Sequence, residues 1–306
     1  MEQSKRLQWL TFNLGFACNF RCKYCFRQHN EKPVLPSKPT EKLKQWLRKN
    51  AIRYKRITIN GGEPLLYKQA IYELFDCVPK WMYKVVITNG SLLDADFVSY
   101  CNENNITISI SHDGACTKAL RGVDVLETKL DLIRSINNLG FHTVITKYNL
   151  NIIDNIRYID KIVNRNDIIH TINNYMEDGN NDPLIEGFDY ELYRKYYVEF
   201  LFNYKRKHKG FGFGNNDGIL GTQILLNGDI VELKTLKKYG TIFDDEEILY
   251  NNIKPDLDGC DCKYKDICNL KKQLASPHMC KLHHMVMEGN SFYKGVINED
   301  LDRDGC

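Results

Sequence analysis

The sequence has no apolar run long enough to cross a membrane, and its N-terminus lacks the charged and then apolar pattern of a secretory signal. It also lacks a strong charge of either sign, since 42 Lys and Arg residues stand against 39 Asp and Glu residues. The densest basic cluster, residues 205–209, is typical of the solvated end of a helix. These absences predict a cytoplasmic protein whose partners include neither a membrane nor a nucleic acid.

Cysteine, by contrast, is abundant. The chain has 11 cysteines, and a cytoplasmic protein with so many favours metal or redox chemistry over structural disulfides. Three of them, Cys18, Cys22 and Cys25, follow an apolar run that ends at Phe16. Three thiolates can hold three corners of an iron–sulfur cube and leave one iron open to a small molecule. A structural zinc site normally closes four ligands, and apart from His29 no further Cys or His lies within fifty residues. The spacing therefore favours a cluster over zinc.

Runs rich in Ile, Val and Thr alternate with amphipathic runs over the first two thirds of the chain. The expected strands are residues 7–14, 56–60, 84–88, 106–111, 143–147 and 168–175. The expected helices are residues 41–50, 67–78, 94–104, 125–139, 153–164 and 190–207. This order predicts an α/β fold with a parallel sheet, either an open partial barrel or a doubly wound sheet.

Uncommon motifs follow the first four expected strands. The cysteine triad follows strand one, Gly61-Gly62-Glu63-Pro64 strand two, Asn89-Gly90 strand three and His112-Asp113-Gly114 strand four. In both sheet types the functional site lies at the carboxyl ends of the strands. We therefore expect these motifs to meet at one edge of the sheet.

The composition changes near residue 208, which predicts two domains, residues 1–208 and 209–306. A glycine-rich stretch, residues 210–216, is typical of a linker. Strands at 222–226 and 230–233 flank Asn227-Gly228, a strong hairpin signal, and a helix is expected at 244–251. The tail carries further cysteines that predict a second metal site, which holds either an iron–sulfur cluster or zinc: Cys260, Cys262, Cys268, Cys280 and the last residue, Cys306.

The spacing Cys18-x3-Cys22-x2-Cys25 resembles the signature of the radical S-adenosylmethionine (SAM) enzymes. The resemblance implies a partial (β/α)6 barrel and a [4Fe–4S] cluster whose open iron chelates SAM. Reductive cleavage of SAM then gives a 5′-deoxyadenosyl radical, which abstracts hydrogen from a substrate carbon. It also implies an electron donor, a reductase such as flavodoxin or ferredoxin.

The Gly61-Gly62-Glu63-Pro64 motif after strand two resembles the glycine-rich motif of the family. The motifs after strands three and four are similar to those of a narrower subgroup, the SPASM/twitch radical SAM enzymes. By this resemblance Ser111 bonds the ribose of SAM, Arg121 meets a carboxylate or a substrate carbonyl, and Tyr24 lies near the adenine. His112 stands where the subgroup usually has an apolar residue, and we expect it to be structural rather than a base. The residues that the resemblance implies around SAM are Tyr24, Gly61, Gly62, Glu63, Pro64, Asn89, Ser111, Asp113, Arg121 and Lys147.

Cys116 follows the fourth motif at the same expected edge of the sheet. By the family resemblance, a thiol there is the candidate that returns a hydrogen atom to a substrate radical, as the family's epimerases require. The alternative is a buried cysteine without a chemical role.

The tail resembles a reduced SPASM domain. It keeps a Cys-x5-Cys spacing, Cys262 to Cys268, but has Lys272 and Leu233 where a full domain has ligands of its first auxiliary cluster. The resemblance implies one auxiliary [4Fe–4S] cluster, with zinc as the alternative. Its expected ligands are Cys260, Cys262, Cys268 and Cys280, with Cys306, His283 and His284 as alternatives for the fourth.

SPASM-type enzymes mostly modify peptides, so the resemblance predicts a maturase that crosslinks or epimerises a ribosomally made peptide or protein. Because the triad begins at residue 18, we expect a separate leader-binding protein or direct recognition by the tail. One alternative is a small-molecule alcohol dehydrogenase of the single-auxiliary-cluster (twitch) type. Another is a zinc protein with no enzymatic activity.

Overall fold

The structure, a computed structural model, describes residues 9–25, 32, 34–175, 182–202, 212–213, 222–232, 235–253, 280–282, 284–285 and 288. Within these residues the strands form a single sheet in the order β10-β9-β8-β1-β2-β3-β4-β5-β6-β7. The central strands are β1 (Trp9–Asn13), β2 (Arg56–Asn60), β3 (Tyr83–Thr88), β4 (Ile106–Ser111), β5 (Leu139–Ile145) and β6 (Ile169–Asn174). Each pairs in parallel with the next. A doubly wound sheet would reverse its order at a switch point, so this sequential order is that of a partial barrel wall.

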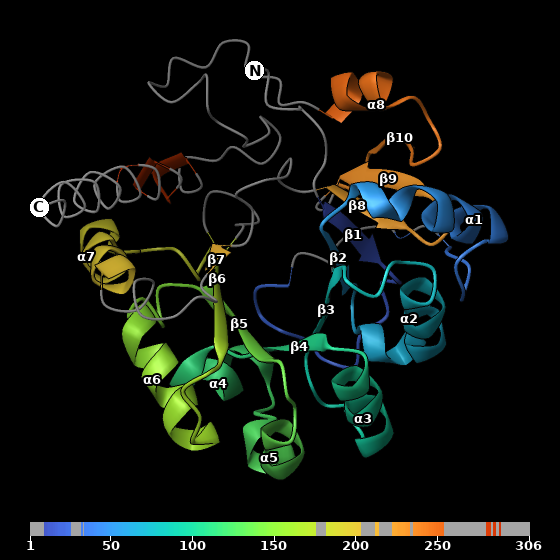
Figure 1. Cartoon of the computed structure of the whole chain (residues 1–306). Coiled ribbons are helices and arrows are strands. Elements are labelled where there is room, and N and C mark those ends of the chain that lie inside the picture. Colours follow the sequence, from blue (N-terminus) through green and yellow to red (C-terminus); the bar gives the residue numbers. More distant parts are fainter. Residues whose placement is uncertain are drawn as a thin grey trace, which may run out of the picture.

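Helices connect the parallel strands and lie along one side of the curved sheet (Figure 1). Four of them begin where a polar side chain accepts a backbone N–H: Thr40 before α1, Asp94 before α3, Asn151 before α6 and Asp189 before α7. The helices are α1 (Glu41–Asn50), α2 (Lys68–Phe75), α3 (Ala95–Glu103), α4 (Thr117–Arg121), α5 (Leu126–Arg134), α6 (Ile152–Val163) and α7 (Tyr190–Phe200). Short 3-10 turns η2 (Ala51–Arg53), η3 (Pro64–Tyr67) and η4 (Gly114–Cys116) complete this half.

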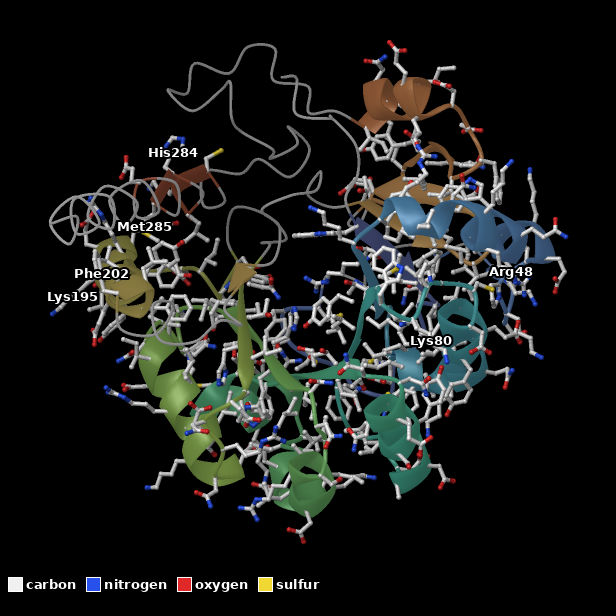
Figure 2. All side chains as sticks on the ribbon, viewed as in Figure 1. Arg48, Lys80, Lys195, Phe202, His284 and Met285 are labelled. Carbon is white, nitrogen blue, oxygen red and sulfur yellow. The ribbon has the colours of Figure 1, made fainter. Side chains whose placement is uncertain are left out.

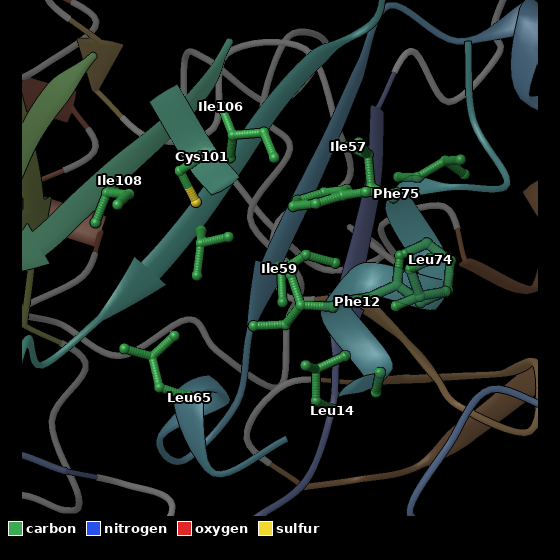
Figure 3. Close-up of a cluster of buried hydrophobic side chains, with 14 of the residues drawn as sticks. Phe12, Leu14, Ile57, Ile59, Leu65, Leu74, Phe75, Cys101, Ile106 and Ile108 are labelled. Carbon is green, nitrogen blue, oxygen red and sulfur yellow. The ribbon is translucent and has the colours of Figure 1, made fainter. Parts of the chain in front are cut away.

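The main core lies between the sheet and these helices. Phe12, Ile57 and Ile59 point toward Leu74 and its neighbours on α2, and all four are fully buried (Figure 3). Because strand side chains alternate, Thr58 and its neighbours two positions away face the opposite side, the interior of the barrel. The apolar face fixes the register of the strands, and this register brings their carboxyl ends to one edge.

The predicted boundary between the fifth helix and the fifth strand is wrong. The helix was expected to reach residue 139 and the strand to begin at 143, but α5 ends at Arg134 and β5 begins at Leu139. Ile136 fits the helical spacing and is fully buried, yet it lies in the connecting loop. Arg165 donates hydrogen bonds to the carbonyl oxygens of Ile136 and Asn137. These bonds satisfy backbone groups of the loop, so it needs no helical partners.

The predicted hairpin is present as β8 (Thr222–Leu225) and β9 (Asp229–Glu232), and β10 (Lys238–Thr241) and α8 (Glu246–Ile253) follow it. β8 pairs in parallel with β1, so the hairpin extends the barrel sheet. The stretch expected to be a linker contains β7 (Gly212–Phe213), which pairs with β6. The expectation of a linker is wrong at these residues, because the free edge of β6 offers backbone partners to a passing chain. The domain boundary near 208 stays a prediction.

A short helical segment near the C-terminus, residues 280–282 and 284–285, packs on α7. Leu282 and Met285 join the same buried cluster as Tyr193 and Phe200, and Figure 2 shows Met285 beside the helix that carries Lys195. In the described part of the chain, no helix combines the length and apolar character that crossing a membrane requires.

Candidate active site

Residues 14–25, here called the cysteine loop, follow β1 and contain the triad. The first part of this loop contacts the turn between β2 and α2. Gly62 donates its backbone N–H to the Gly15 carbonyl at 2.8 Å, and Glu63 donates to the Ala17 carbonyl at 2.8 Å. A Cβ atom on Gly62 would lie 2.2 Å from the Ala17 oxygen. The glycine is therefore required for the β2–α2 turn to approach the cysteine loop so closely.

Glu63 joins this turn to the next strand. Its carboxylate is fully buried and accepts hydrogen bonds from the Thr88 hydroxyl (2.6 Å), the Asn89 N–H (2.8 Å) and the Leu65 N–H (2.9 Å). Burial raises the pKa of Glu63, and these three donors oppose that rise. The carboxylate thus links the end of β2 to the end of β3 by hydrogen bonds.

The loop after β3 reaches the triad itself. The Asn89 side-chain amide donates to the Asn19 side-chain oxygen at 2.9 Å and lies 3.9 Å from the Cys18 sulfur. Asn19 in turn donates to the Ser91 hydroxyl at 2.8 Å. A side-chain clamp of three polar residues therefore holds the loop at its first cysteine.

The end of the cysteine loop, around Tyr24, contacts residues that follow β4 and residues of α4. The Tyr24 hydroxyl donates to the buried Asp113 carboxylate at 2.6 Å, and Arg121 binds the same carboxylate through two nitrogens at 2.7 and 3.1 Å. Asp113 also accepts the Val144 N–H of β5 at 3.0 Å. The Tyr24 ring lies 6.3 Å from the Tyr175 ring, just after β6. The cysteine loop thus crosses the carboxyl edge of the sheet, and the motifs meet there as predicted.

The thiols of the triad lie in a partly buried setting. Burial raises the pKa of Cys18, and it raises the pKa of Cys22 to about 11, against the attraction of Arg121. Both are therefore protonated at neutral pH until a metal displaces the proton.

The residues present fit a cubane cluster better than a single ion. Among the residues that the structure describes, no group of three His, Cys, Asp or Glu side chains is gathered closely enough to hold one metal ion. Cys18, Cys22 and Cys25 are all half-buried on one loop, and in the described part of the chain no His or carboxylate joins them to complete a four-ligand zinc site. A cube needs one thiolate at each of three separate irons, and the donor set matches that need.

Other predicted site residues lie along the same edge. Ser111 ends β4 and is half-buried, and the Pro64 ring is buried at the start of η3. Lys147 follows β5, and its ammonium donates to the Glu186 carbonyl at 3.1 Å. Cys116 donates to the Tyr148 carbonyl at 3.3 Å and packs in the apolar cluster that contains Tyr24.

His112 is fully buried behind this edge. Its Nδ1 accepts the Gly114 N–H at 3.2 Å, so its Nε2 carries the proton and donates to Asp124 at 3.0 Å. The Thr117 hydroxyl also lies 2.9 Å from Nδ1. These bonds shape the loop after β4 and keep the ring away from the edge.

The second predicted metal site lies largely outside the described residues: Cys260, Cys262, Cys268, Cys306 and His283 are not among them. Cys280 is half-buried at the start of the segment on α7, and His284 lies on the same segment. The ligand set of this site stays a prediction.

Sequence reasoning missed the clamp residues Asn19 and Ser91 and the role of Tyr175. A signal existed for Asn19, a short amide next to a metal-ligating cysteine, which often bonds a neighbouring turn. Nothing in the spacing marked Tyr175, because its contact with Tyr24 joins loops that are far apart in the sequence.

A comparison with known protein families supports this arrangement. The model of the Radical SAM superfamily matches residues 12–165, which include the cysteine loop and the strand ends β1 to β5. The chain belongs to the radical SAM superfamily. The prediction from the cysteine spacing is confirmed, and the family implies a [4Fe–4S] cluster and SAM as cofactors.

Individual relatives of this radical SAM protein differ in how much of it they match. An S-adenosylmethionine-dependent nucleotide dehydratase of Fibrobacter sp. (strain UWH6) is 27% identical over 162 residues, 46% of this chain and 49% of that protein. The chain spans about half the length of this curated relative.

Solved structures match over more of the chain at lower identity. The structure of anSMEcpe with bound AdoMet has a TM-score of 0.67 and 16% identity, and the match covers 96% of this chain and 99% of that one. SuiB of Streptococcus suis bound to S-adenosylmethionine has a TM-score of 0.64 and 17% identity over 88% of this chain and 74% of its own. At such identity the likeness shows the fold alone.

Proposed function

We propose that this radical SAM enzyme modifies a peptide or protein substrate, by forming a crosslink or by epimerising a residue. The observation that carries the proposal is the extent of the structural match. The fold of anSMEcpe, which has been solved with AdoMet and a peptide, is matched over 95% of this chain and 99% of that one. SuiB, likewise solved with its precursor peptide SuiA, is matched over 88% of this chain.

The proposal assigns roles to the described residues at the carboxyl edge of the sheet. Cys18, Cys22 and Cys25 would hold the cluster. With SAM bound, the cluster would supply a carbon-centred radical that removes hydrogen from the substrate. The remaining roles belong to the protein, which positions the ligands and excludes water.

Several side chains at the edge are proposed to contact SAM. The Ser111 hydroxyl, half-buried at the end of β4, would bond the ribose. The carbonyl oxygens of Gly61 and Gly62 would accept from the ammonium group of SAM, because the N–H donors of this turn are directed at the cysteine loop. Lys147 and the Tyr24 ring would border the adenosyl group, and Cys116 would be placed to return hydrogen in an epimerisation.

A second candidate function is a reaction on a small molecule. It is favoured by the nucleotide dehydratase, which matches this chain in sequence rather than in fold alone. In this case the substrate would be a nucleotide or a sugar-like alcohol, and the predicted twitch type of tail would suit it.

The two candidates make different products. The anaerobically reconstituted protein would be incubated with SAM, a reductant and either the peptide encoded beside the gene or a panel of nucleoside triphosphates. A peptide that loses two hydrogens, or keeps its mass with altered chirality, supports the first proposal. A nucleotide product with no change in the peptide would contradict it. Flavodoxin or ferredoxin is the proposed natural reductant, and a separate leader-binding protein would be tested as a stimulator.

The triad is tested without any substrate. Cys18→Ala, Cys22→Ala and Cys25→Ala should each abolish 5′-deoxyadenosine formation, measured by chromatography, because the cube loses one of its three protein ligands. Cys77→Ala is the matched control, since this buried thiol belongs to the apolar core. Cleavage of SAM by any of the three triad variants would contradict the assignment of these cysteines as ligands of the SAM-binding cluster.

The proposed auxiliary site is tested by metal content. A loaded protein with two cubes should carry about eight irons per chain, whereas a zinc tail should give about four irons and one zinc. Cys268→Ala should keep SAM cleavage but lose the product. Full product yield from this variant would show the tail site to be dispensable.

A further inference from the structure

The six parallel strands β1 to β6 contain no aspartate or glutamate. Their side chains alternate between the helices and the interior of the barrel. The helix-facing side chains of Phe12, Ile57 and Ile59 are fully buried, whereas Ser111 and His142, which face the interior, are only half-buried. Water therefore reaches this interior, and the wall that these six strands form carries no carboxylate.

Arg56 places a cation in the barrel interior. It begins β2, and its Nε donates to the Thr58 hydroxyl at 2.9 Å. Because Thr58 lies nearer the carboxyl end of the strand, the Arg56 side chain extends along the inner wall toward the edge that carries the triad. Its guanidinium lies 5.3 Å from the centre of the Trp9 ring and 5.5 Å from that of the Tyr83 ring. Both distances are within cation–π range, so residues of β1 and β3 orient the guanidinium from either side.

No anion neutralises Arg56 in the described part of the chain. Apart from the bond to Thr58, its guanidinium has no acceptor within hydrogen-bond distance there, and its two terminal nitrogens are not enclosed. Burial lowers the pKa of His142, and Arg56 and Arg121 lower it further, which places both cations near this ring. Arg121 is paired with the Asp113 carboxylate. Arg56 is therefore the unpaired cation of the two.

The chemistry of this group selects its ligand. A guanidinium with both terminal nitrogens available binds a carboxylate or a phosphate through two parallel hydrogen bonds. The attraction is stronger inside a protein than in water, because the effective dielectric constant is lower. Thr58, which marks the depth of the guanidinium, lies about 7 Å along β2 from Asn60 at the carboxyl edge. A molecule anchored on Arg56 by an oxyanion would therefore place atoms a few bonds away at the level of the triad.

We propose that Arg56 binds an anionic group of the substrate, a carboxylate or a phosphate, inside the barrel, and thereby sets how deeply the substrate enters. The inference rests on the proposed function for the source of the anion. In the first candidate function the anion is an acidic side chain of the peptide, and in the second it is the phosphate of a nucleotide. Both sources present the same chemistry to the guanidinium.

The test measures anion binding directly, by titration calorimetry. The probes are glutarate and, separately, inorganic pyrophosphate, added to anaerobically reconstituted protein in the presence of excess SAM, so that the SAM site is already taken. Arg56→Gln should weaken binding about tenfold or more, because it removes a charge-assisted pair of hydrogen bonds. Arg53→Gln is the matched control, since it removes an equal charge from an arginine that is 39% exposed and paired with Glu246.

We expect at least one probe to bind the wild type and the Arg53→Gln variant with equal affinity. A preference for glutarate identifies a carboxylate site, and a preference for pyrophosphate identifies a phosphate site. The proposal is overturned if neither probe binds the wild type, or if Arg56→Gln binds as tightly as the wild type. If Arg56→Gln does not fold, Arg56→Lys decides. It keeps the charge but loses the two-nitrogen fork, so weaker binding supports the site and unchanged affinity refutes it.

These outcomes are distinct from those that test the proposed function. A peptide left unmodified, together with anion binding that depends on Arg56, contradicts the peptide proposal and leaves the anion site in place. A peptide modified with the same KM by the wild type and by Arg56→Gln, when neither probe binds, removes the anion site and keeps the peptide proposal.

Discussion

The two sides on which the cysteine loop is anchored are built differently. On one side, toward β2 and β3, the loop is held by backbone hydrogen bonds from Gly62 and Glu63 and by the neutral side chains of Asn19 and Asn89. On the other side, toward β4 to β6, it is held by the hydrogen bond from Tyr24 to the buried Asp113 carboxylate, which also forms an ion pair with Arg121. The first side depends on close backbone fit, and the second depends on charge.

This difference suggests that the two sides stabilise the cysteine loop in different ways. Close backbone approach fixes where the first thiol lies, because a glycine contact leaves little room for displacement. A buried ion pair is weak evidence for net stability, since desolvation offsets the attraction, but breaking it is costly. The charged side is therefore expected to be the more sensitive to removal of one partner.

Asp113→Ala tests the charged side and should have the largest effect. It leaves the Arg121 guanidinium buried without a carboxylate, so the free energy of unfolding should fall by about 3–5 kcal/mol. The measurement is chemical denaturation of the apo-protein. Asp167→Ala is the control, because its carboxylate is 60% exposed beside Arg165 and its loss should cost about 1 kcal/mol or less. Equal losses from the two variants would contradict the contrast between the sides.

Gly62→Ala tests the side of backbone fit. Its Cβ would meet the Ala17 oxygen at 2.2 Å, so the turn or the cysteine loop must move, at a cost of about 1–3 kcal/mol. Iron uptake should fall sharply, because the displaced segment leads directly into Cys18. At Gly122, φ is +86° but a Cβ would meet nothing within 4 Å. Gly122→Ala should therefore lower stability while sparing iron uptake. Normal iron uptake by Gly62→Ala would show that close fit is not needed.

The two sides also differ in how far the sequence predicted them. The glycine motif after β2 and the turn after β3 are contiguous, and β2, β4 and α1 have the predicted bounds because their apolar patterns are regular. On the charged side, the hydrogen bond from Tyr24 to Asp113 joins residues that are 89 positions apart in the sequence. No local pattern predicts such a contact. The sequence did mark each of these residues, but as a contact of SAM rather than as partners of one another.

The predicted start of β5 was wrong for a related reason. Ile136 keeps helical spacing after the helix has ended, and what stabilises its loop is Arg165, in the turn before β6. A local signal against the helix was available in Asn137 and Asn138, which favour turns. The tail is a different case, since most of its cysteines lie outside the described residues.

The pH dependence of stability gives a smaller test of the charged side. Burial and the nearby cations Arg56 and Arg121 lower the pKa of His142 on β5 to about 3, from about 6.5 in an unfolded chain. Below pH 6.5 the unfolded chain therefore binds a proton that the folded chain does not, and stability falls as the pH decreases toward 3.

This proton contributes at most about 1.4 kcal/mol per pH unit. In His142→Gln, which can still bond Ser109, the decline in stability between pH 6 and pH 4 should be shallower than in wild type. Denaturation midpoints at several pH values measure it. Parallel curves for the two proteins would mean that burial and the two cations do not lower the pKa of this ring.

Asn19→Ala should have the smallest effect. It removes the bond from Asn89 and the bond to Ser91, each worth about 0.5–1.5 kcal/mol at most, and the second is exposed, so water replaces it. The backbone bonds of Gly62 and Glu63 remain, and we expect iron uptake close to that of wild type. Asn50→Ala, which loses a partly buried bond to the Trp46 carbonyl, is the control for a lost amide. If Asn19→Ala instead loses iron as Gly62→Ala does, the clamp rather than backbone fit positions Cys18, and the contrast between the two sides becomes one between neutral and charged side chains.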